Sequence, residues 1–260
     1  MKVVLFCGGL GTRLREHTEM VPKPMVNIGQ RPILWHLMMY YAHFGHREFI
    51  LCLGYMGESI KQYFINYAEW ISNDFQLSGP GNEIHLFNRD IAEWKITFAD
   101  TGRNANIGQR LRAVQPYLGE DSTFLANYSD GLSDLPLGDY LDSFAKKDKI
   151  ASFVSVHPHH SFHTVTAGAD HLVQKLSPAN RSDLRINGGF FAFKREIFDY
   201  LRAGEDLVEE PFQRLLADQQ LLAYPHDGFW ACMDTFKDKK GFDEMYMRDE
   251  MPWQLWRPRS

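Results

Sequence analysis

The chain has 260 residues, of which 44% are hydrophobic and 23% are charged, and its formal net charge at pH 7 is −5. This composition is typical of a soluble globular protein, and the negative charge argues against nucleic acid as a partner, since phosphate backbones are held by clustered Lys and Arg. No apolar run approaches the roughly 18 residues of a membrane span, so we expect no membrane partner. The start, MKVVLFCGG, lacks the pattern of a secretory signal, and we expect a cytoplasmic protein.

The first half of the chain alternates strands with helices. Apolar and β-branched runs predict buried strands at 2–7, 48–54, 94–100 and 122–130. Apolar residues at helical spacing predict helices from Pro32 to Gly45, from Gly57 to about Trp70, and through Gly108 to Val114. Strand–helix–strand units predict a parallel sheet with right-handed crossovers.

The second half has a different pattern, with short strands predicted around 150–156, 171–176 and 188–194 and only short helices between them. We interpret these as added antiparallel strands that cover a substrate site. The chain has no internal repeat and no linker rich in Pro, Gly and Ser. It therefore predicts one compact α/β domain over 1–260 with a small peripheral antiparallel sheet.

The three cysteines, Cys7, Cys52 and Cys232, are far apart and show no C-x-x-C spacing. Such an odd set predicts neither a disulfide framework nor a zinc site, and we expect buried thiols.

A glycine-rich stretch follows the first predicted strand, and a lysine between two prolines comes ten residues after it: Gly8, Gly9, Leu10, Gly11, Thr12, Arg13 and then Lys23. Backbone N–H groups of such a loop converge on anions, so we expect a phosphate ligand. The P-loop pattern fails because no Gly-Lys-Ser or Gly-Lys-Thr follows. The dinucleotide fingerprint fails because Leu14 stands where its third glycine belongs.

The remaining pattern, GGLGTR (8–13) with KPM (23–25), resembles the sugar-1-phosphate nucleotidyltransferases, and most closely the glucose-1-phosphate cytidylyltransferases. The resemblance covers almost the whole chain through VPKPMVNIGQRPILWH (21–36), LGYMGESIKQYFINY (53–67), DTG (100–102), GQRL (108–111), NYSDG (127–131), INGGFF (186–191), GFWACMDT (228–235) and PWQLW (252–256). It implies a Rossmann-like, mostly parallel sheet flanked by helices, the GT-A-like fold of nucleotide-diphospho-sugar transferases.

The resemblance also implies a reaction. A sugar 1-phosphate attacks the α-phosphorus of a nucleoside triphosphate, with CTP favoured, and gives a nucleotide sugar and pyrophosphate. Residues 1–135 would form the nucleotide-binding half, and residues 136–260 the half for sugar binding and oligomerisation. We expect a nucleoside triphosphate and a sugar 1-phosphate as partners, and a homo-oligomer that is a dimer or a hexamer.

Individual roles follow from the same resemblance. Gly8, Gly9, Leu10, Gly11 and Thr12 would wrap the nucleotide, Arg13 would hold the leaving pyrophosphate, and Lys23 would stabilise charge near the α-phosphate. Asp130 and Asp234 would share one Mg²⁺, which keeps few carboxylate ligands and completes its octahedron with phosphate and water. Arg13, Lys23 and Asp130 are thus the expected catalytic residues, while Gln109 and Arg110 would bind the nucleotide.

The sugar half departs from the family pattern. Asn187 and Gly188 would face the sugar, but His163 stands where the family has glycine in Phe-Gly-Ala/Val, and no Glu-Lys-Pro survives in VQKLSPANRSD (173–183). Lys175 or Arg181 would have to replace its lysine, and we expect His163 and Lys175 near the sugar. These changes predict, as an alternative, an acceptor other than glucose 1-phosphate with UTP or dTTP as a possible donor. Ser129 also replaces the usual glycine before Asp130.

Several features have plainer interpretations. Read without its partners, Lys23 is a solvated lysine and Asp130 a turn residue. The run HPHH (157–160) is interpreted as a solvated loop rather than a metal site.

Two other functional classes stay open. A glycosyltransferase would commonly present Asp-x-Asp, whereas the next acid after Asp130 is Asp134. A silent nucleotide-binding sensor is supported only by the missing Glu-Lys-Pro.

Overall fold

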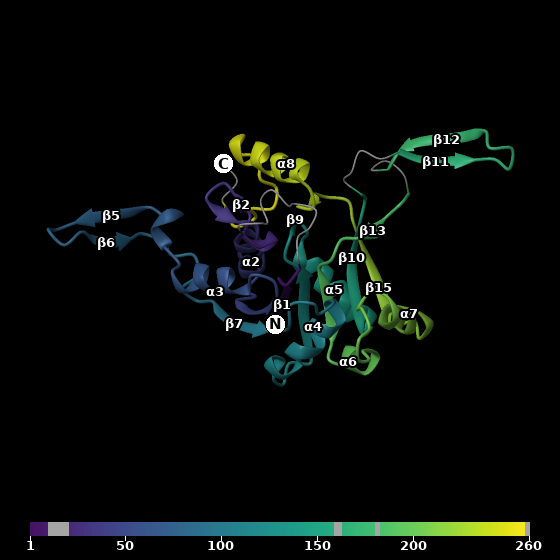
Figure 1. Cartoon of the computed structure of the whole chain (residues 1–260), viewed down its shortest axis with the longest axis horizontal. Helices are drawn as coiled ribbons and strands as arrows, with labels where there is room; N and C mark the ends of the chain where they lie inside the picture. The colour runs from purple at the N-terminus through teal and green to yellow at the C-terminus, as the bar shows by residue number, and fades with distance from the viewer. Residues whose placement is uncertain (10–20, 159–162, 180–182, 258–260) are drawn as a thin grey trace.

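The computed structural model describes residues 1–9, 21–158, 163–179 and 183–257 (Figure 1). Within them, the central element is an eight-stranded sheet with the order β13-β10-β14-β8-β1-β4-β7, and β15 pairs with β10. Its strands are β1 (Val3–Phe6), β4 (Glu48–Leu53), β7 (Lys95–Asp100), β8 (Thr123–Tyr128), β10 (Ala151–Val156), β13 (Ile186–Asn187), β14 (Phe191–Lys194) and β15 (Leu221–His226).

The half of this sheet built from β8, β1, β4 and β7 is parallel, as the sequence predicts. β1 lies between β8 and β4, so the carboxyl ends of neighbouring strands meet at one edge of the sheet. Ligands bind outside that edge in open α/β sheets, so the fold directs attention to the residues that follow β1 and β8.

Two strands predicted to form an added sheet belong to the central one. β14 is antiparallel to both β8 and β10, while β10 also pairs in parallel with β15. Both β10 and β14 are almost entirely buried, and such strands are covered on both faces, which an outer sheet does not provide. The prediction of peripheral strands at 150–156 and 188–194 was therefore wrong, whereas residues 173–178 do form part of a separate hairpin.

Helices cover both faces of the sheet, as Figure 1 shows. They are α2 (Ile33–His43), α3 (Gly57–Ile65), α4 (Ile107–Val114), α5 (Leu137–Lys147), α6 (Ile197–Tyr200), α7 (Glu210–Ala217) and α8 (Phe236–Met247), with 3₁₀ turns η2 (Lys23–Met25), η3 (Glu69–Ile71) and η4 (Gln115–Leu118). The helix predicted from Gly57 ends at Ile65, and Trp70 lies in η3. None of the helices in the described residues has the length and apolar character of a membrane span.

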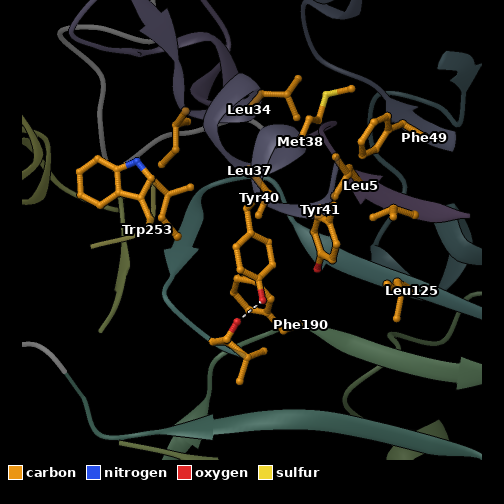
Figure 2. Close-up of a cluster of buried hydrophobic side chains, with 14 of the residues drawn as sticks. Leu5, Leu34, Leu37, Met38, Tyr40, Tyr41, Phe49, Leu125, Phe190 and Trp253 are labelled. Atoms are coloured by element: carbon orange, nitrogen blue, oxygen red, sulfur yellow. Dashed lines mark hydrogen bonds between the residues drawn. The ribbon is translucent and has the colours of Figure 1, made fainter. Parts of the chain in front are cut away.

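The core has two parts because side chains alternate along a strand. Val3 and Leu5 of β1 belong to a cluster with α2, whereas Val4 and Phe6 belong to a second cluster on the other face of the sheet. Figure 2 shows the first cluster, in which Tyr40 of α2 is buried and donates a hydrogen bond to the Leu135 carbonyl at 2.7 Å. A tightly packed core of this kind fixes the strand ends that carry the polar residues.

Four small antiparallel sheets complete the described fold. They pair β2 (Asn27–Ile28) with β3 (Arg31–Pro32), β5 (Phe75–Ser78) with β6 (Glu83–Leu86), β9 (Gly131–Ser133) with β16 (Trp230–Cys232), and β11 (His163–Ala167) with β12 (Val173–Pro178). The β5–β6 and β11–β12 hairpins project from opposite sides of the body in Figure 1.

Candidate active site

A cavity of about 300 Å³ lies at the carboxyl ends of β1 and β8. Its lining residues are Phe6, Gly8, Gly9, Lys23, Pro24, Ala105, Asn106, Ile107, Arg110, Tyr128, Ser129, Asp130, Asp206 and Asp234. Two of these side chains are cationic and three are anionic, so the described part of the lining carries no excess positive charge.

Three charged side chains from distant parts of the chain meet at this cavity. The ammonium nitrogen of Lys23 lies 2.5 Å from a carboxylate oxygen of Asp130 and 2.5 Å from one of Asp234. All three side chains are partly buried, with 15% of Lys23, 23% of Asp130 and 22% of Asp234 exposed. The group is thus shielded from bulk water but open to the cavity.

The small β9–β16 sheet brings the two aspartates together. Asp130 directly precedes β9, and Asp234 comes two residues after the end of β16. Gly131 is the register partner of Cys232, and the Met233 N–H donates to the Asp130 carbonyl at 2.8 Å. Strand pairing therefore fixes the spacing of the two carboxylates.

A helix start holds the second aspartate from the other side. Thr235 caps α8, and the side chain of Asp238 accepts hydrogen bonds from the backbone N–H groups of Asp234 and Thr235, at 3.1 and 2.8 Å. Such a capping box satisfies the free N–H groups of a first helical turn. Asp234 is consequently held at a rigid helix start rather than in a mobile loop.

Lys23 reaches this group from η2, where it lies between Pro22 and Pro24. Proline fixes its own backbone φ angle, so the two rings restrict the path of the chain on either side of the lysine. Burial alone would lower the pKa of Lys23, but the carboxylates of Asp130 and Asp234 together raise it above its ordinary value. The side chain therefore stays cationic at neutral pH.

Arg110 takes part in the cavity through a different set of partners. Its guanidinium is almost fully buried and donates to the carbonyls of Leu53, Gly102, Gly8 and Arg103 and to the Thr101 hydroxyl, at 2.8 to 3.4 Å. Burial lowers the pKa of Arg110 from its ordinary value. These partners follow or end β1, β4 and β7, so Arg110 ties three adjacent strand ends together.

A side chain at position 8 would have to displace this guanidinium. A Cβ at Gly8 would lie 2.1 Å from Nη1 of Arg110, far inside van der Waals contact. The requirement comes from space rather than from an unusual backbone angle. The first glycine of the loop is thus explained by the arginine that packs on it.

Ser129 links the strand ends on the other side of β1. Its hydroxyl donates to the Phe6 carbonyl at 2.8 Å, next to the buried Cys7. Burial raises the pKa of Cys7 to about 12, so this thiol is a neutral packing group at physiological pH. Ser129, the residue directly before Asp130, is therefore held against the end of β1.

Comparisons with known proteins identify the family. A family model described as nucleotidyl transferase matches residues 2–238. A Bacillus subtilis (strain 168) protein named "Probable glucose-1-phosphate cytidylyltransferase" is 38% identical over 258 residues, which cover 98% of this chain and 100% of that protein. The glucose-1-phosphate cytidylyltransferase of Salmonella typhimurium is 36% identical over 257 residues, with coverage of 98% and 100%. The chain belongs to the nucleotidyl transferase family.

The fold of this nucleotidyl transferase agrees with that assignment. A solved structure of UDP-glucose pyrophosphorylase complexed with UDP-glucose superposes with a TM-score of 0.69 at 14% identity, covering 95% of this chain and 98% of that one. The nucleotide-diphospho-sugar transferase fold implied by the sequence motifs is therefore confirmed, together with the small antiparallel sheets.

The donor set of the transferase fits a magnesium ion. Within the described residues, no three His, Cys, Asp or Glu side chains come together as a metal-binding group, so the candidate protein ligands are the two carboxylates of Asp130 and Asp234. Both reach one ammonium nitrogen, which shows that their oxygens are close enough to share one cation. Mg²⁺ is commonly bound by one or two carboxylates plus phosphate and water, and this pair suits it.

Several residues predicted from the sequence do not line the cavity. His163 and Lys175 are exposed on the β11–β12 hairpin, and the side chain of Gln109 caps α4 by accepting from the Asn106 N–H at 2.9 Å. Leu10, Gly11, Thr12 and Arg13 lie outside the described residues, as does Arg181.

Asn187 and Gly188 occupy β13 and the turn after it. The Asn187 side chain accepts from the Gly189 N–H at 2.9 Å, and the Gly188 carbonyl accepts from the Trp230 indole at 2.8 Å. Trp230 begins β16, which leads to Asp234. One hydrogen bond thus connects the predicted sugar-facing segment to the strand that positions the second aspartate.

Other cavity residues were missed by sequence reasoning: Phe6, Pro24, Ala105, Asn106, Ile107, Tyr128 and Asp206. A signal existed for three of them. Asn106 and Gln109 have the spacing of a capping box, Pro24 lies inside the KPM motif, and Tyr128 lies inside the NYSDG motif. Asp206 lies in a loop with no motif, and only the tertiary fold brings it to the cavity.

Proposed function

We propose that this transferase joins CTP to glucose 1-phosphate and gives CDP-glucose and pyrophosphate, with Mg²⁺ as its cofactor. The observation that carries the proposal is the meeting of Lys23, Asp130 and Asp234 at the end of the parallel sheet. The relatives named as glucose-1-phosphate cytidylyltransferases, over 98% of the chain, support the choice of substrates.

The charges of the cavity support a metal requirement. A nucleoside triphosphate carries several negative charges, and a lining with two cationic and three anionic described side chains does not neutralise them. When bound, Mg²⁺ would be held by Asp130 and Asp234 and would supply charge neutralisation at the phosphates. Lys23 would then leave its two carboxylate partners at least in part and donate to the phosphate oxygens.

In the proposed reaction, a phosphate oxygen of the sugar phosphate forms a bond to the α-phosphorus of CTP. The bond from this phosphorus to the bridging oxygen breaks, and pyrophosphate leaves with that oxygen. The chain needs no covalent intermediate; its residues orient the two phosphates and stabilise the charge that develops between them. Lys23 is the described residue suited to the α-phosphate, and the Gly8–Gly9 backbone to the nucleotide. Arg13 remains the proposed group for the pyrophosphate.

A second candidate within the same class keeps the chemistry and changes the substrates. It uses UTP or dTTP and a sugar 1-phosphate other than glucose 1-phosphate. The exposed position of His163 and Lys175 on the β11–β12 hairpin favours an altered sugar half, since neither residue lines the described cavity.

One experiment tests the proposal and ranks the candidates. The protein is incubated with Mg²⁺, one of CTP, UTP, dTTP, ATP or GTP, and one member of a panel of sugar 1-phosphates, and pyrophosphate release is measured. We expect release that needs both substrates, fastest with CTP and glucose 1-phosphate. Silence with every pair, alongside measurable nucleotide binding, would instead support a sensor, and glycosyl transfer from a supplied nucleotide sugar would support a glycosyltransferase.

The proposal extends to the setting of the enzyme. We propose a cytoplasmic homo-oligomer that acts in nucleotide sugar and polysaccharide biosynthesis. Sedimentation of the protein with membranes in a cell fractionation would contradict the cytoplasmic location. A monomeric mass in solution would contradict the homo-oligomer.

A further inference from the structure

Asp206 gives the active-site cavity a third carboxylate, for which neither the proposed reaction nor the proposed metal site has a use. It lies in the loop that joins α6 to α7 and is partly buried. It lines the described cavity together with Asp130 and Asp234. A partly buried carboxylate without a cation is unfavourable on its own, so a ligand that satisfies it is to be expected.

The cavity extends across the strand ends, and Asp206 lies on the side away from the metal-binding pair. Val26, which follows η2, and Met233, directly before Asp234, belong to the first core cluster. Leu207, directly after Asp206, belongs to the second cluster, on the other face of the sheet. Among the described residues, no cation forms an ion pair with Asp206, whereas Asp234 shares one with Asp130.

Apolar and aromatic side chains line the cavity near Asp206. Ile107 and Tyr128 line it and pack against the second core cluster, and the rings of Phe6 and Tyr128 lie 6.3 Å apart. Burial, followed by the Asp206 carboxylate, raises the pKa of Tyr128, so the carboxylate lies near this ring and the phenol stays protonated. An apolar wall with one hydrogen-bonding group beside it suits a planar heterocyclic ring.

This part of the cavity does not suit a phosphate. Besides Lys23, the cation of the described lining is Arg110, and its guanidinium already donates to five oxygen atoms of the protein. Asn106 is occupied too, since it caps α4 and donates to the carbonyl of Gly204, in the loop of Asp206, at 3.0 Å. A carboxylate without a cation repels phosphate, so an uncharged part of the nucleotide should meet Asp206.

The loop of Asp206 is held firmly against the start of α4. A Cβ at Gly108 would lie 2.4 Å from the Glu205 carbonyl, so helix and loop are in direct contact. The Asp206 carboxylate accepts from the Val208 N–H at 3.4 Å, a long hydrogen bond that uses one of its two oxygens. The other oxygen has no hydrogen-bond partner among the described residues and is available to a ligand.

A carboxylate only accepts hydrogen bonds, and the pyrimidine bases differ in what they offer to it. Cytosine carries an amino group at position 4, which donates, whereas uracil and thymine carry an oxygen there, which accepts. From these observations we infer that Asp206 selects cytosine by accepting a hydrogen bond from the 4-amino group of CTP. The oxygen of UTP or dTTP would face the carboxylate without a proton between them. Asp206 would then decide the nucleotide of the proposed reaction, on which this inference rests.

Nucleotide binding without catalysis tests the role of Asp206. The affinities of the full-length wild type and of Asp206→Asn for CTP and UTP are measured by calorimetry, with Mg²⁺ and without a sugar phosphate. We expect the wild type to bind CTP about 10- to 100-fold more tightly than UTP, the range of one good base contact. In Asp206→Asn the two affinities should come close together, because an amide can also donate to the uracil oxygen.

Glu209→Gln is the matched control. Glu209 follows in the same segment, directly before α7, but it is exposed and does not line the cavity. Its substitution removes the same charge, so the preference for CTP over UTP should stay at the wild-type value. Thermal melts of both variants check the fold, which Asp206→Asn should keep because asparagine can also accept from the Val208 N–H.

A modified nucleotide gives the same test without a mutation. The triphosphate of 2-pyrimidinone riboside lacks the 4-amino group and is otherwise close to CTP. The wild type should bind it severalfold more weakly than CTP, and this loss should be smaller in Asp206→Asn. Equal binding of the two nucleotides by the wild type overturns the inference.

The remaining outcomes separate this inference from the proposed function. An unchanged preference for CTP in Asp206→Asn overturns the inference alone, as does an equal loss of CTP and UTP affinity, which would indicate contact with the ribose. A change confined to a separate titration with glucose 1-phosphate would indicate the hexose and also overturn it. A wild type that binds no nucleotide contradicts the proposed function itself, and one that prefers UTP favours its second candidate; selection of cytosine by Asp206 fails in both cases.

Discussion

Two buried cations in this protein have opposite surroundings. Lys23 lies between the carboxylates of Asp130 and Asp234 and faces a cavity, with 15% of its side chain exposed. Arg31 is 3% exposed, contacts one carboxylate at 3.8 Å, and has hydroxyl, carbonyl and aromatic partners on the remaining sides.

The difference indicates what each cation does. The partners of Arg31 satisfy its planar donors within the protein, which is the arrangement of a structural group. Lys23 is held by two carboxylates that suit a metal ion as well, so its contacts can be exchanged when an anionic ligand arrives. One ion pair therefore stabilises the fold, whereas the other would, in the proposed reaction, give up its carboxylate contacts to an anionic ligand.

The largest expected effect tests the structural role of Arg31. Arg31→Ala would leave Asp90 buried and without its cation, and we expect a loss of about 3–5 kcal/mol in the free energy of unfolding. Urea denaturation measures it. Arg47→Ala is the control, since the Arg47–Glu93 pair is 49% and 72% exposed and should contribute at most about 1 kcal/mol. Equal losses in the two variants would contradict a structural role for Arg31.

Acid should affect the structural region through His36, whose buried ring donates to the Ile28 carbonyl at 3.1 Å. Burial lowers the pKa of His36 to about 4 from 6.5. Between these values the unfolded chain binds a proton that the folded chain does not, so stability is complete above pH ~6.5 and falls by about 3 kcal/mol as the pH drops toward ~4.

His36→Gln isolates this contribution. Unfolding free energies of the wild type and the variant are compared from pH 7 to pH 4, because burial also lowers the pKa of His46 to about 4 and both proteins share that effect. We expect a steeper acid loss in the wild type. Parallel pH curves would show that His36 does not set the slope.

Substitutions of the three charged residues at the cavity should lower the turnover number. Lys23→Ala, Asp130→Asn and Asp234→Asn are each expected to lower kcat by at least ~100-fold, about 2.7 kcal/mol, the scale of removing one preorganised charge from an active site. Asp148→Asn is the control: Asp148 also pairs with a lysine, Lys194, but it is 83% exposed and does not line the cavity. A wild-type kcat in any of the three would mean that its role is misassigned.

A smaller effect is expected for Ser129, which both stabilises the fold and positions Asp130. Ser129→Ala removes the 2.8 Å hydrogen bond to the Phe6 carbonyl, and we expect a loss of about 1 kcal/mol in unfolding free energy. Without this bond the backbone directly before Asp130 is no longer tied to β1, so the Asp130 carboxylate is less firmly positioned. We therefore expect kcat to fall severalfold with little change in KM. A change in KM alone would point to substrate contact instead of positioning.

Much of this architecture was predictable because it depends on short stretches of the sequence. The buried runs of β1, β4, β7 and β8 and the helix begun by Pro32 follow from apolar spacing and from glycine and proline. The candidate site residues Lys23, Asp130 and Asp234 were named from motifs, and the structure brings their side chains to one point although 107 and 211 residues separate the lysine from the two aspartates. Their chemical roles remain predictions.

The rest depended on long-range pairing that no local pattern encodes. β10 and β14 read as outer strands, yet their partners β8 and β15 make them central. Arg110 was predicted to bind the nucleotide, and a single sequence cannot show that its donors go to carbonyls at the ends of three other strands. The apolar cross-strand pairs of the β5–β6 hairpin are visible only once the register places Leu77 opposite Ile84.

The close approach of Gly8 and Arg110 has an evolutionary consequence. A side chain at position 8 would occupy the space of the guanidinium, which lies 2.1 Å from the site of its first carbon. Relatives that gain a larger residue at position 8 should therefore carry a shorter one at position 110 and must hold the three strand ends by other means. The two positions, 102 residues apart, are expected to mutate as a coupled pair.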